Sequence, residues 1–160
     1  MILRSSALAL ALLASPLAVA PASAAVPCSK AAIARIVHLD RFESITAIRC
    51  AELTGDGRTD VAYSKSGGGS GGDVQWGVVY ERGGARRIAR FAGHTHYAGL
   101  RIRGRRVLID SPRYRPADPN CCPSAGSRTE SASWNGHRFV ERLVAIRPQR
   151  SAGSRAADGR

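Results

Sequence analysis

The chain lacks an apolar segment long enough to cross a membrane. Its N-terminal apolar stretch covers residues 7–20, whereas a bilayer core of about 30 Å takes roughly 20 consecutive apolar residues to cross. Arg4 precedes this stretch, and a small-residue run, Ala-Ser-Ala at residues 22–24, follows it. This order is typical of a cleaved secretion signal. We therefore expect residues 1–24 to be a removed signal peptide and the protein to be secreted or extracytoplasmic.

Lysine is scarce, since Lys30 and Lys65 are the only lysines against 22 arginines. The arginines are scattered along the chain, and the aromatic residues, 6% of the total, are not interleaved with them as in single-strand nucleic-acid sites. We therefore expect no specific nucleic-acid partner. The formal net charge is +12, and removing residues 1–24 takes away Arg4 and no acid, which leaves +11. Such a charge favours an anionic partner, for example an acidic polymer of the cell envelope.

Only one short segment has helical periodicity. Ser29 is a suitable helix cap, and Ala32, Ile33, Ile36 and Val37 follow at helical spacing, which predicts a helix at residues 29–38. Later segments have strand character, and Asn-Gly at residues 135–136 indicates a hairpin. The expected strands are residues 45–52, 60–66, 74–81, 85–91, 100–103, 107–109, 128–134 and 138–144.

These elements predict one β-rich domain at residues 25–147, followed by a disordered basic tail at residues 148–160 that has no apolar periodicity. Because the strands follow one another closely, antiparallel pairing is expected. The predicted fold class is α+β, with the short N-terminal helix packed on an antiparallel β-meander and held by disulfide bonds.

No Cys-x-x-Cys spacing occurs, which weakens the case for a zinc site built from cysteines with His94 or His96. All four cysteines lie beyond residue 24. An exported protein enters an oxidising space, so disulfide bonds are expected. The four are Cys28, Cys50, Cys121 and Cys122.

Four cysteines allow three pairings. A bond between the adjacent Cys121 and Cys122 brings the two Cα atoms closer than is usual for a disulfide. We therefore favour a bond from each of Cys28 and Cys50 to one member of this pair. The alternative joins Cys28 to Cys50 and leaves a disulfide between the adjacent cysteines, which would indicate redox sensing or ligand contact.

The segment 52-ELTGDGRTD-60 has the pattern of a calcium-binding loop. Calcium prefers several oxygen ligands at about 2.3–2.6 Å, which short acidic loops supply at alternate positions. The loop is not an EF-hand, because Tyr63 replaces the Glu at position twelve. The alternative is a turn between strands whose carboxylates bind the local backbone. The candidate ligands are Glu52, Thr54, Asp56, the backbone carbonyl of Arg58, and Asp60.

This loop resembles the calcium loop of FG-GAP propeller repeats, which reads DxTGDGxxD and is followed by a strand. The resemblance implies Ca2+ as a candidate cofactor. Propellers repeat such a segment several times, whereas this chain contains it once, so it does not build a propeller.

A second segment, DPNCCPS at residues 118–124, is followed by WNG at residues 134–136. Together they resemble the C-terminal signature of small exported actinobacterial proteins of the LppP/LprE type, which often have an upstream DLTGDG segment. The resemblance covers residues 50–140. It implies an envelope-associated or secreted β-rich domain and supplies no catalytic residues. Because Pro27 precedes Cys28, the chain departs from the lipid-anchored members.

No nucleophile elbow, Gly-x-Ser-x-Gly, is present, so a set such as Ser66, His94 and Asp110 has no supporting context. We therefore assign no catalytic residue. The function we expect is a non-catalytic exported domain that binds an anionic envelope component and, weakly, calcium. The alternative is a small secreted hydrolase such as a ribonuclease, with His94 or His137 as its acid.

Overall fold

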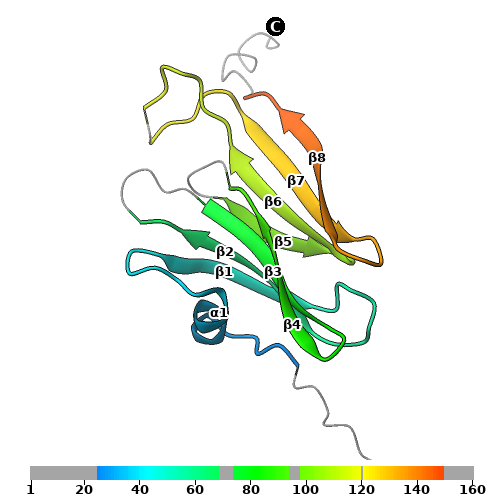
Figure 1. Ribbon diagram of the computed structural model, residues 1–160. Helices are drawn as coiled ribbons and strands as arrows, with labels where there is room; N and C mark the ends of the chain where they lie inside the picture. The colour runs from blue at the N-terminus through cyan, green and yellow to red at the C-terminus, as the bar shows by residue number, and fades with distance from the viewer. Residues whose placement is uncertain (1–24, 69–73, 94–97, 120, 150–160) are drawn as a thin grey trace, which may run out of the picture.

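The computed structural model describes residues 25–68, 74–93, 98–119 and 121–149. The predicted signal peptide, His94, His96 and residues 150–160 of the predicted tail lie outside the described residues. The described part forms one short helix and eight strands (Figure 1). They are α1 (Lys30–Val37), β1 (Ser44–Ala51), β2 (Asp60–Ser66), β3 (Val74–Arg82), β4 (Ala85–Phe91), β5 (Gly99–Arg103), β6 (Arg106–Pro112), β7 (Ser127–Trp134) and β8 (Phe139–Arg147).

The predicted helix is confirmed as α1. The Ser29 hydroxyl accepts a hydrogen bond from the backbone N–H of Ala32 at 3.2 Å and so satisfies one of the free donors at the helix start. His38 ends the helix in a left-handed conformation with φ of 55°. Ile33 and Val37 are buried on the face that packs against the first sheet.

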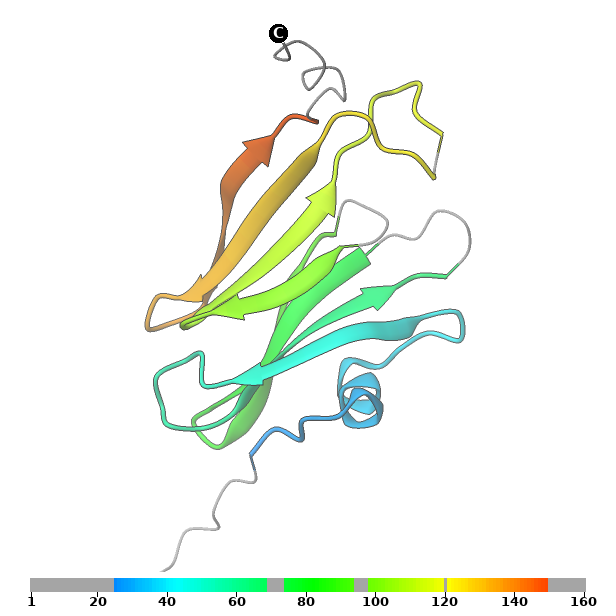
Figure 2. The ribbon, with the colours of Figure 1, turned by 180° about the vertical axis from the view of Figure 1, so that it is seen from behind.

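The strands form two antiparallel four-stranded sheets, in the orders β1-β2-β3-β4 and β5-β6-β7-β8. Figures 1 and 2 show α1 on one side of the first sheet and the second sheet on its other side. The predicted fold class, α+β with a single meander, is therefore wrong. The described chain is mostly β and divides into two sheets between β4 and β5.

The burial of β3 explains this division. Trp76 and Val78 are buried on one face of the strand, and Val79 is buried on the other. The single short helix covers only one face of the first sheet, so the second sheet covers the other. The core between the sheets consists of Leu53, Ala62, Trp76, Val78, Tyr80, Leu100, Val107, Ile109, Ala132 and Phe139.

The disulfide pairing differs from the one we favoured. Cys28 bonds to Cys50, with Cα atoms 6.0 Å apart, and Cys121 bonds to Cys122. The favoured cross-links fail for a spatial reason. Cys28 precedes α1 and Cys50 lies in β1, whereas the loop with Cys121 and Cys122 projects from the far end of the second sheet (Figure 1).

Candidate functional site

Asp60, the last candidate ligand of the 52–60 loop, is a buried carboxylate at the start of β2. Its Oδ2 accepts hydrogen bonds from the backbone N–H of Leu53 at 2.8 Å, from the N–H of Thr54 at 2.9 Å and from the Thr54 hydroxyl at 3.1 Å. Its Oδ1 is buried and has no hydrogen-bond partner among the described residues. Burial raises the pKa of Asp60, and the charge of Asp56 adds to the rise, although the bonds from Leu53 and Thr54 lower it.

Glu52, the first candidate ligand, is bound by an arginine from the second sheet. Its Oε2 accepts hydrogen bonds from Nε of Arg105 at 2.9 Å and from Nη2 at 2.5 Å, and its Oε1 accepts one from the N–H of Gly55. The Arg105 guanidinium also lies over Gly55, where a Cβ atom would be 2.7 Å from its Nη2. The loop therefore connects the first sheet to the β5–β6 turn.

The two remaining candidate ligands are Asp56 and the backbone carbonyl of Arg58, and Asp56 has a backbone partner within the loop. Asp56 Oδ1 accepts a hydrogen bond from the backbone N–H of Arg58 at 2.9 Å, as in a tight turn. The Arg58 side chain forms an ion pair with Glu81 at 2.9 Å. The structure thus joins Thr54 to Asp60 and turns Glu52 toward Arg105. In the described ranges, no group of three or more His, Cys, Asp or Glu side chains is placed to hold a metal ion.

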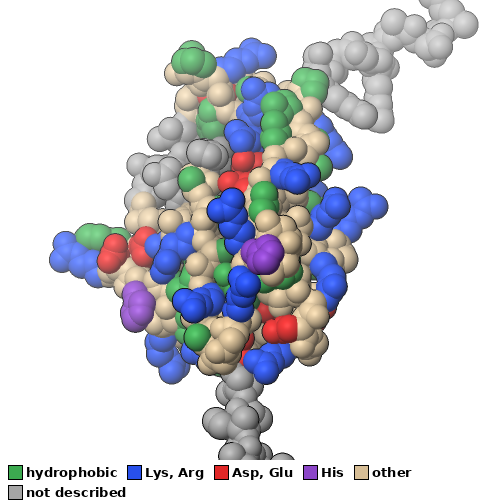
Figure 3. All heavy atoms as spheres, turned by 45° about the vertical axis from the view of Figure 1, so that its right-hand side comes forward, with side chains coloured by type: hydrophobic (Ala, Val, Ile, Leu, Met, Phe, Trp, Pro, Cys, Tyr) green, Lys and Arg blue, Asp and Glu red, His purple; other side chains and the backbone are tan. Residues whose placement is uncertain are grey.

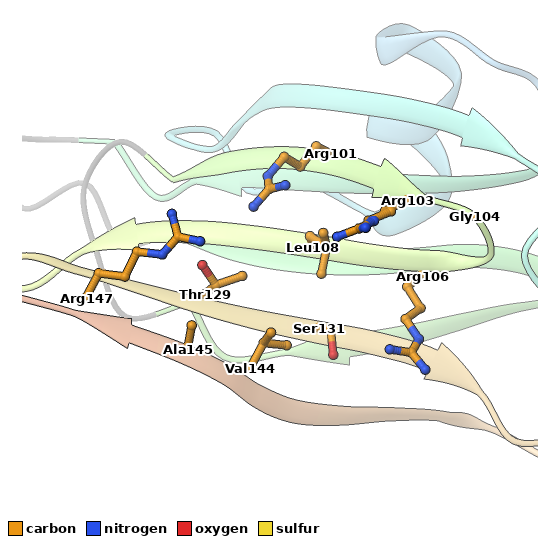
Figure 4. A pocket seen from close by; sticks show the side chains of 10 residues that line it. All are labelled: Arg101, Arg103, Gly104, Arg106, Leu108, Thr129, Ser131, Val144, Ala145 and Arg147. Carbon is orange, nitrogen blue, oxygen red and sulfur yellow. The ribbon is translucent and has the colours of Figure 1, made fainter.

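A groove of about 440 Å³ lies on the face of the second sheet that points away from the first. Each of its four strands contributes to the lining. In Figure 4, the guanidinium groups of Arg101 and Arg147 point toward each other across the sheet, and the Arg103 side chain runs toward Leu108. The polar side chains of the lining are Arg101, Arg103, Arg106, Arg147, Thr129 and Ser131.

Strand alternation places these residues on one face. Val107 and Ile109 point into the core between the sheets, so Leu108 points into the groove. Leu108 pairs with Ser131 across β6 and β7. Both are buried although none of the described helices or strands packs on this face. The Arg103 side chain runs toward Leu108 (Figure 4), as expected of an arginine whose aliphatic part lies along apolar surface while its guanidinium stays in water.

Four guanidinium groups line this groove, and the Asp110 carboxylate of β6 is bonded to one of them, that of Arg101. Asp110 Oδ1 accepts hydrogen bonds from Arg101 Nη2 at 2.9 Å and from the Thr129 hydroxyl at 2.6 Å. The bonds from Arg101 lower the pKa of Asp110, against a smaller rise from burial, and the bond from Thr129 and the charge of Arg147 lower it further. Asp110 is therefore held as an anion that fixes Arg101 at the edge of the groove.

The other three arginines of the groove form no ion pair within the described part of the chain. Figure 3 shows Lys and Arg side chains spread over the visible surface, with few Asp or Glu side chains between them. Because the groove is open to solvent and its charge is largely uncompensated, it offers several donors to an anionic ligand.

The groove was not predicted from the sequence, in which the arginines are scattered. Arg101 and Arg103 alternate with Leu100 and Ile102 there, which indicates only that the two arginines share one face of a strand. Arg147 lies more than forty positions further along the chain and joins the groove only because β8 lies in the same sheet. Such a grouping depends on strand order, which the alternation does not specify.

Of the residues proposed for a hydrolase, His94 lies outside the described residues, and the others come from different elements. His137 is exposed at the β7–β8 turn, where its backbone carbonyl accepts a hydrogen bond from Arg82. Ser66 lies in β2 of the first sheet and Asp110 in β6 of the second.

Among the described residues, no helix is long and apolar enough to cross a membrane. A comparison of the chain with protein-family models, curated proteins and solved structures finds no match.

Proposed function

We propose that this protein is a non-catalytic exported domain that binds an anionic cell-envelope polymer in the groove of the second sheet. The observation that carries this proposal is the convergence of Arg101, Arg103, Arg106 and Arg147 on one face. Arginine presents a planar set of donors that suits phosphate and carboxylate groups. Because the donors come from β5, β6 and β8, the groove fits a ligand with several negative charges better than a single small anion.

The composition of the groove favours binding over catalysis. Its lining contains arginine, hydroxyl, glycine and aliphatic side chains, and none of its described members is His, Cys, Asp or Glu. General acid–base catalysis needs a group that titrates near the working pH. Arginine is a poor proton acceptor. The Thr129 hydroxyl donates to the Asp110 carboxylate, whose lowered pKa makes it a weak base for activating a nucleophile.

The 52–60 loop has a structural role in this proposal. Glu52 binds Arg105, and Asp60 binds the backbone at Leu53 and Thr54. These contacts tie the loop to both sheets. Because Arg105 binds Glu52, we expect calcium not to stabilise the native loop, and the test is described in the Discussion.

The proposal is tested by measuring affinity for two defined polymers, polyphosphate and polyglutamate, which represent phosphate and carboxylate polymers. The first variant, Arg103→Gln with Arg147→Gln, removes two charges from the groove. The matched control, Arg86→Gln with Arg87→Gln, removes two exposed charges from β4 of the other sheet. The two variants have the same net charge, so a difference between their affinities comes from the position of the removed charges.

We expect the groove variant to bind at least one polymer about tenfold or more weakly, because hydrogen bonds to charged groups contribute roughly 1.5–3 kcal/mol each. The control should differ from the wild type by less than about threefold, since scattered charges act only through the general field. Equal losses in the two variants, or no binding of either polymer, would reject the groove as the site. Cleavage of a bound polymer would support the alternative, a secreted hydrolase.

A further inference from the structure

The disulfide between Cys121 and Cys122 lies in the loop that connects β6 to β7. Both cysteines are exposed. The Cα atoms of the pair are 3.8 Å apart and the sequence separation is one residue. A bond between neighbours closes no loop of the unfolded chain, so it gives almost none of the stabilisation that loop closure provides. Stabilisation of the fold therefore does not explain the presence of the Cys121–Cys122 disulfide.

The other disulfide is of a different kind. Cys28 and Cys50 are separated by 22 residues, and their bond ties the segment before α1 to β1. Cys50 is partly buried against the core between α1 and the first sheet. Cys28 itself is exposed, so only the Cys50 end of the bond is partly shielded from solvent. The bond restricts the unfolded chain, as is expected of a structural disulfide.

The loop around Cys121 and Cys122 is held by contacts that do not involve sulfur. Asp118 Oδ2 accepts hydrogen bonds from the N–H of Arg115 and the N–H of Ser124, both at 2.7 Å, and its Oδ1 accepts one from the Ser124 hydroxyl at 2.6 Å. The N–H of Cys122 donates to the carbonyl of Pro119 at 2.9 Å. Because these bonds do not involve the sulfur atoms, we expect the framework of the loop to remain when the disulfide is opened.

Backbone bonds also close the base of this loop. The N–H of Arg113 donates to the Gly126 carbonyl at 2.8 Å, and the N–H of Ala125 donates to the Arg113 carbonyl at 3.0 Å. Gly126 has φ of +88°, and a Cβ atom at this position would collide with the carbonyl of Arg147 at the end of β8. The two sulfur atoms are thus presented by a loop that is anchored to the sheet independently of them.

We propose that Cys121–Cys122 is a reactive disulfide that exchanges with the dithiol site of a partner oxidoreductase, while Cys28–Cys50 stays intact. A thiolate of the partner attacks one sulfur of the pair, the S–S bond breaks, and a mixed disulfide forms. The second thiol of the partner then displaces this protein's sulfur. The partner ends as a disulfide and the adjacent cysteines end as two thiols, so two electrons and two protons move.

The first test is a reduction series on the oxidised protein with dithiothreitol, followed by alkylation of free thiols and peptide mapping. We expect Cys121 and Cys122 to be alkylated at dithiothreitol concentrations at least about tenfold below those that open Cys28–Cys50. The near-ultraviolet circular dichroism of the buried aromatic residues should not change over that range. Opening of Cys28–Cys50 first, or loss of the aromatic signal together with Cys121–Cys122, would overturn the proposal.

The second test traps the exchange itself. A thioredoxin whose resolving cysteine is replaced by serine stops the reaction at the mixed disulfide. We expect the trapped adduct to map to Cys121 or Cys122 and to be lost in the Cys121→Ser/Cys122→Ser variant. Adducts on Cys28 or Cys50, or the absence of any adduct, would contradict the proposal. Neither experiment involves an anionic polymer, so the outcomes of both are independent of the proposed function.

Discussion

The Tyr63 side chain lies against the backbone of Gly77, its direct partner across β2 and β3. A Cβ atom at position 77 would be 2.7 Å from Tyr63 Oη and would also collide with the Ala89 carbonyl. The Tyr63 ring is fully buried between α1 and the first sheet. The absence of a side chain at Gly77 is therefore what makes room for the largest side chain of this layer.

Gly77→Ala should destabilise the protein by about 1–3 kcal/mol, the usual cost of overpacking a core. The matched control is Gly67→Ala, because a Cβ atom there would have no neighbour within 4 Å, and its effect should stay within about 0.5 kcal/mol. Denaturant unfolding of both variants checks this. Equal stability of the two variants would show that Tyr63 and Ala89 move aside easily.

Asp60 should give the protein a recognisable pH dependence, because burial raises its pKa above the ordinary value of 3.8. The folded state then binds a proton more readily than the unfolded state, so the contribution of Asp60 to stability falls as pH rises from that value through the folded pKa. Asp60→Asn removes this titration and leaves the other carboxylates unchanged.

We therefore expect the wild type to lose stability relative to Asp60→Asn as pH rises through this window, and the difference to become constant above it. Urea unfolding at a series of pH values, with a calcium chelator present, measures it. A wild type that gains stability relative to the variant with rising pH would mean that the carboxylate is stabilised as an anion.

The calcium prediction depends on Arg105, because its guanidinium binds Glu52 and lies over Gly55. We expect millimolar calcium to leave the wild-type melting temperature unchanged and to raise that of Arg105→Gln, in which Glu52 is released. With a dissociation constant of about 1 mM, 5 mM calcium would stabilise the variant by roughly 1 kcal/mol.

Magnesium serves as the ion control, and Asp56→Ala in the Arg105→Gln background removes a loop carboxylate. A calcium-specific rise in the wild type that disappears in Asp56→Ala would instead establish the loop as a calcium site in the native protein.

The two disulfides should differ in their effect on stability. Cys28→Ala with Cys50→Ala should lower the free energy of unfolding by about 3 kcal/mol, the value expected for a loop of this size. Cys121→Ser with Cys122→Ser should change it by less than about 0.5 kcal/mol. Thermal unfolding of the oxidised variants measures both. A larger loss from the second variant would show that the adjacent pair holds the fold.

Local features of this fold were predictable because local sequence determines them. Ser29 and the apolar residues that follow it specify α1 through capping and periodicity. Asn135 specifies the last turn, where its Oδ1 accepts hydrogen bonds from the N–H groups of His137 and Arg138 at 3.0 and 2.9 Å. The strand that we expected after the Gly-Asp-Gly turn is likewise present, as β2 at Asp60–Ser66.

The division into two sheets was not predictable in the same way. Alternation shows that Trp76 and Val78 share a face, but it does not show that Val107 and Ile109 pack against that face. The same limit applies to the groove, since Arg101 and Arg147 belong to opposite edges of one sheet. The predicted disulfide pairing was wrong because it rested only on the usual Cα separation within a disulfide. The sequence does not show that Cys28 and Cys50 lie far from Cys121 and Cys122 in the fold.

The central claim, that the arginine groove binds an anionic polymer, is tested most directly by nuclear magnetic resonance. The 15N-labelled protein is titrated with polyphosphate at about 0.15 M salt, where long-range charge effects are screened. We predict shifts of the side-chain Nε–Hε signals of Arg101, Arg103, Arg106 and Arg147, with backbone shifts at Thr129 and Ser131. The signals of Arg86 and Arg87 should stay in place. Shifts spread evenly over all arginines, or concentrated on the first sheet, would contradict the account.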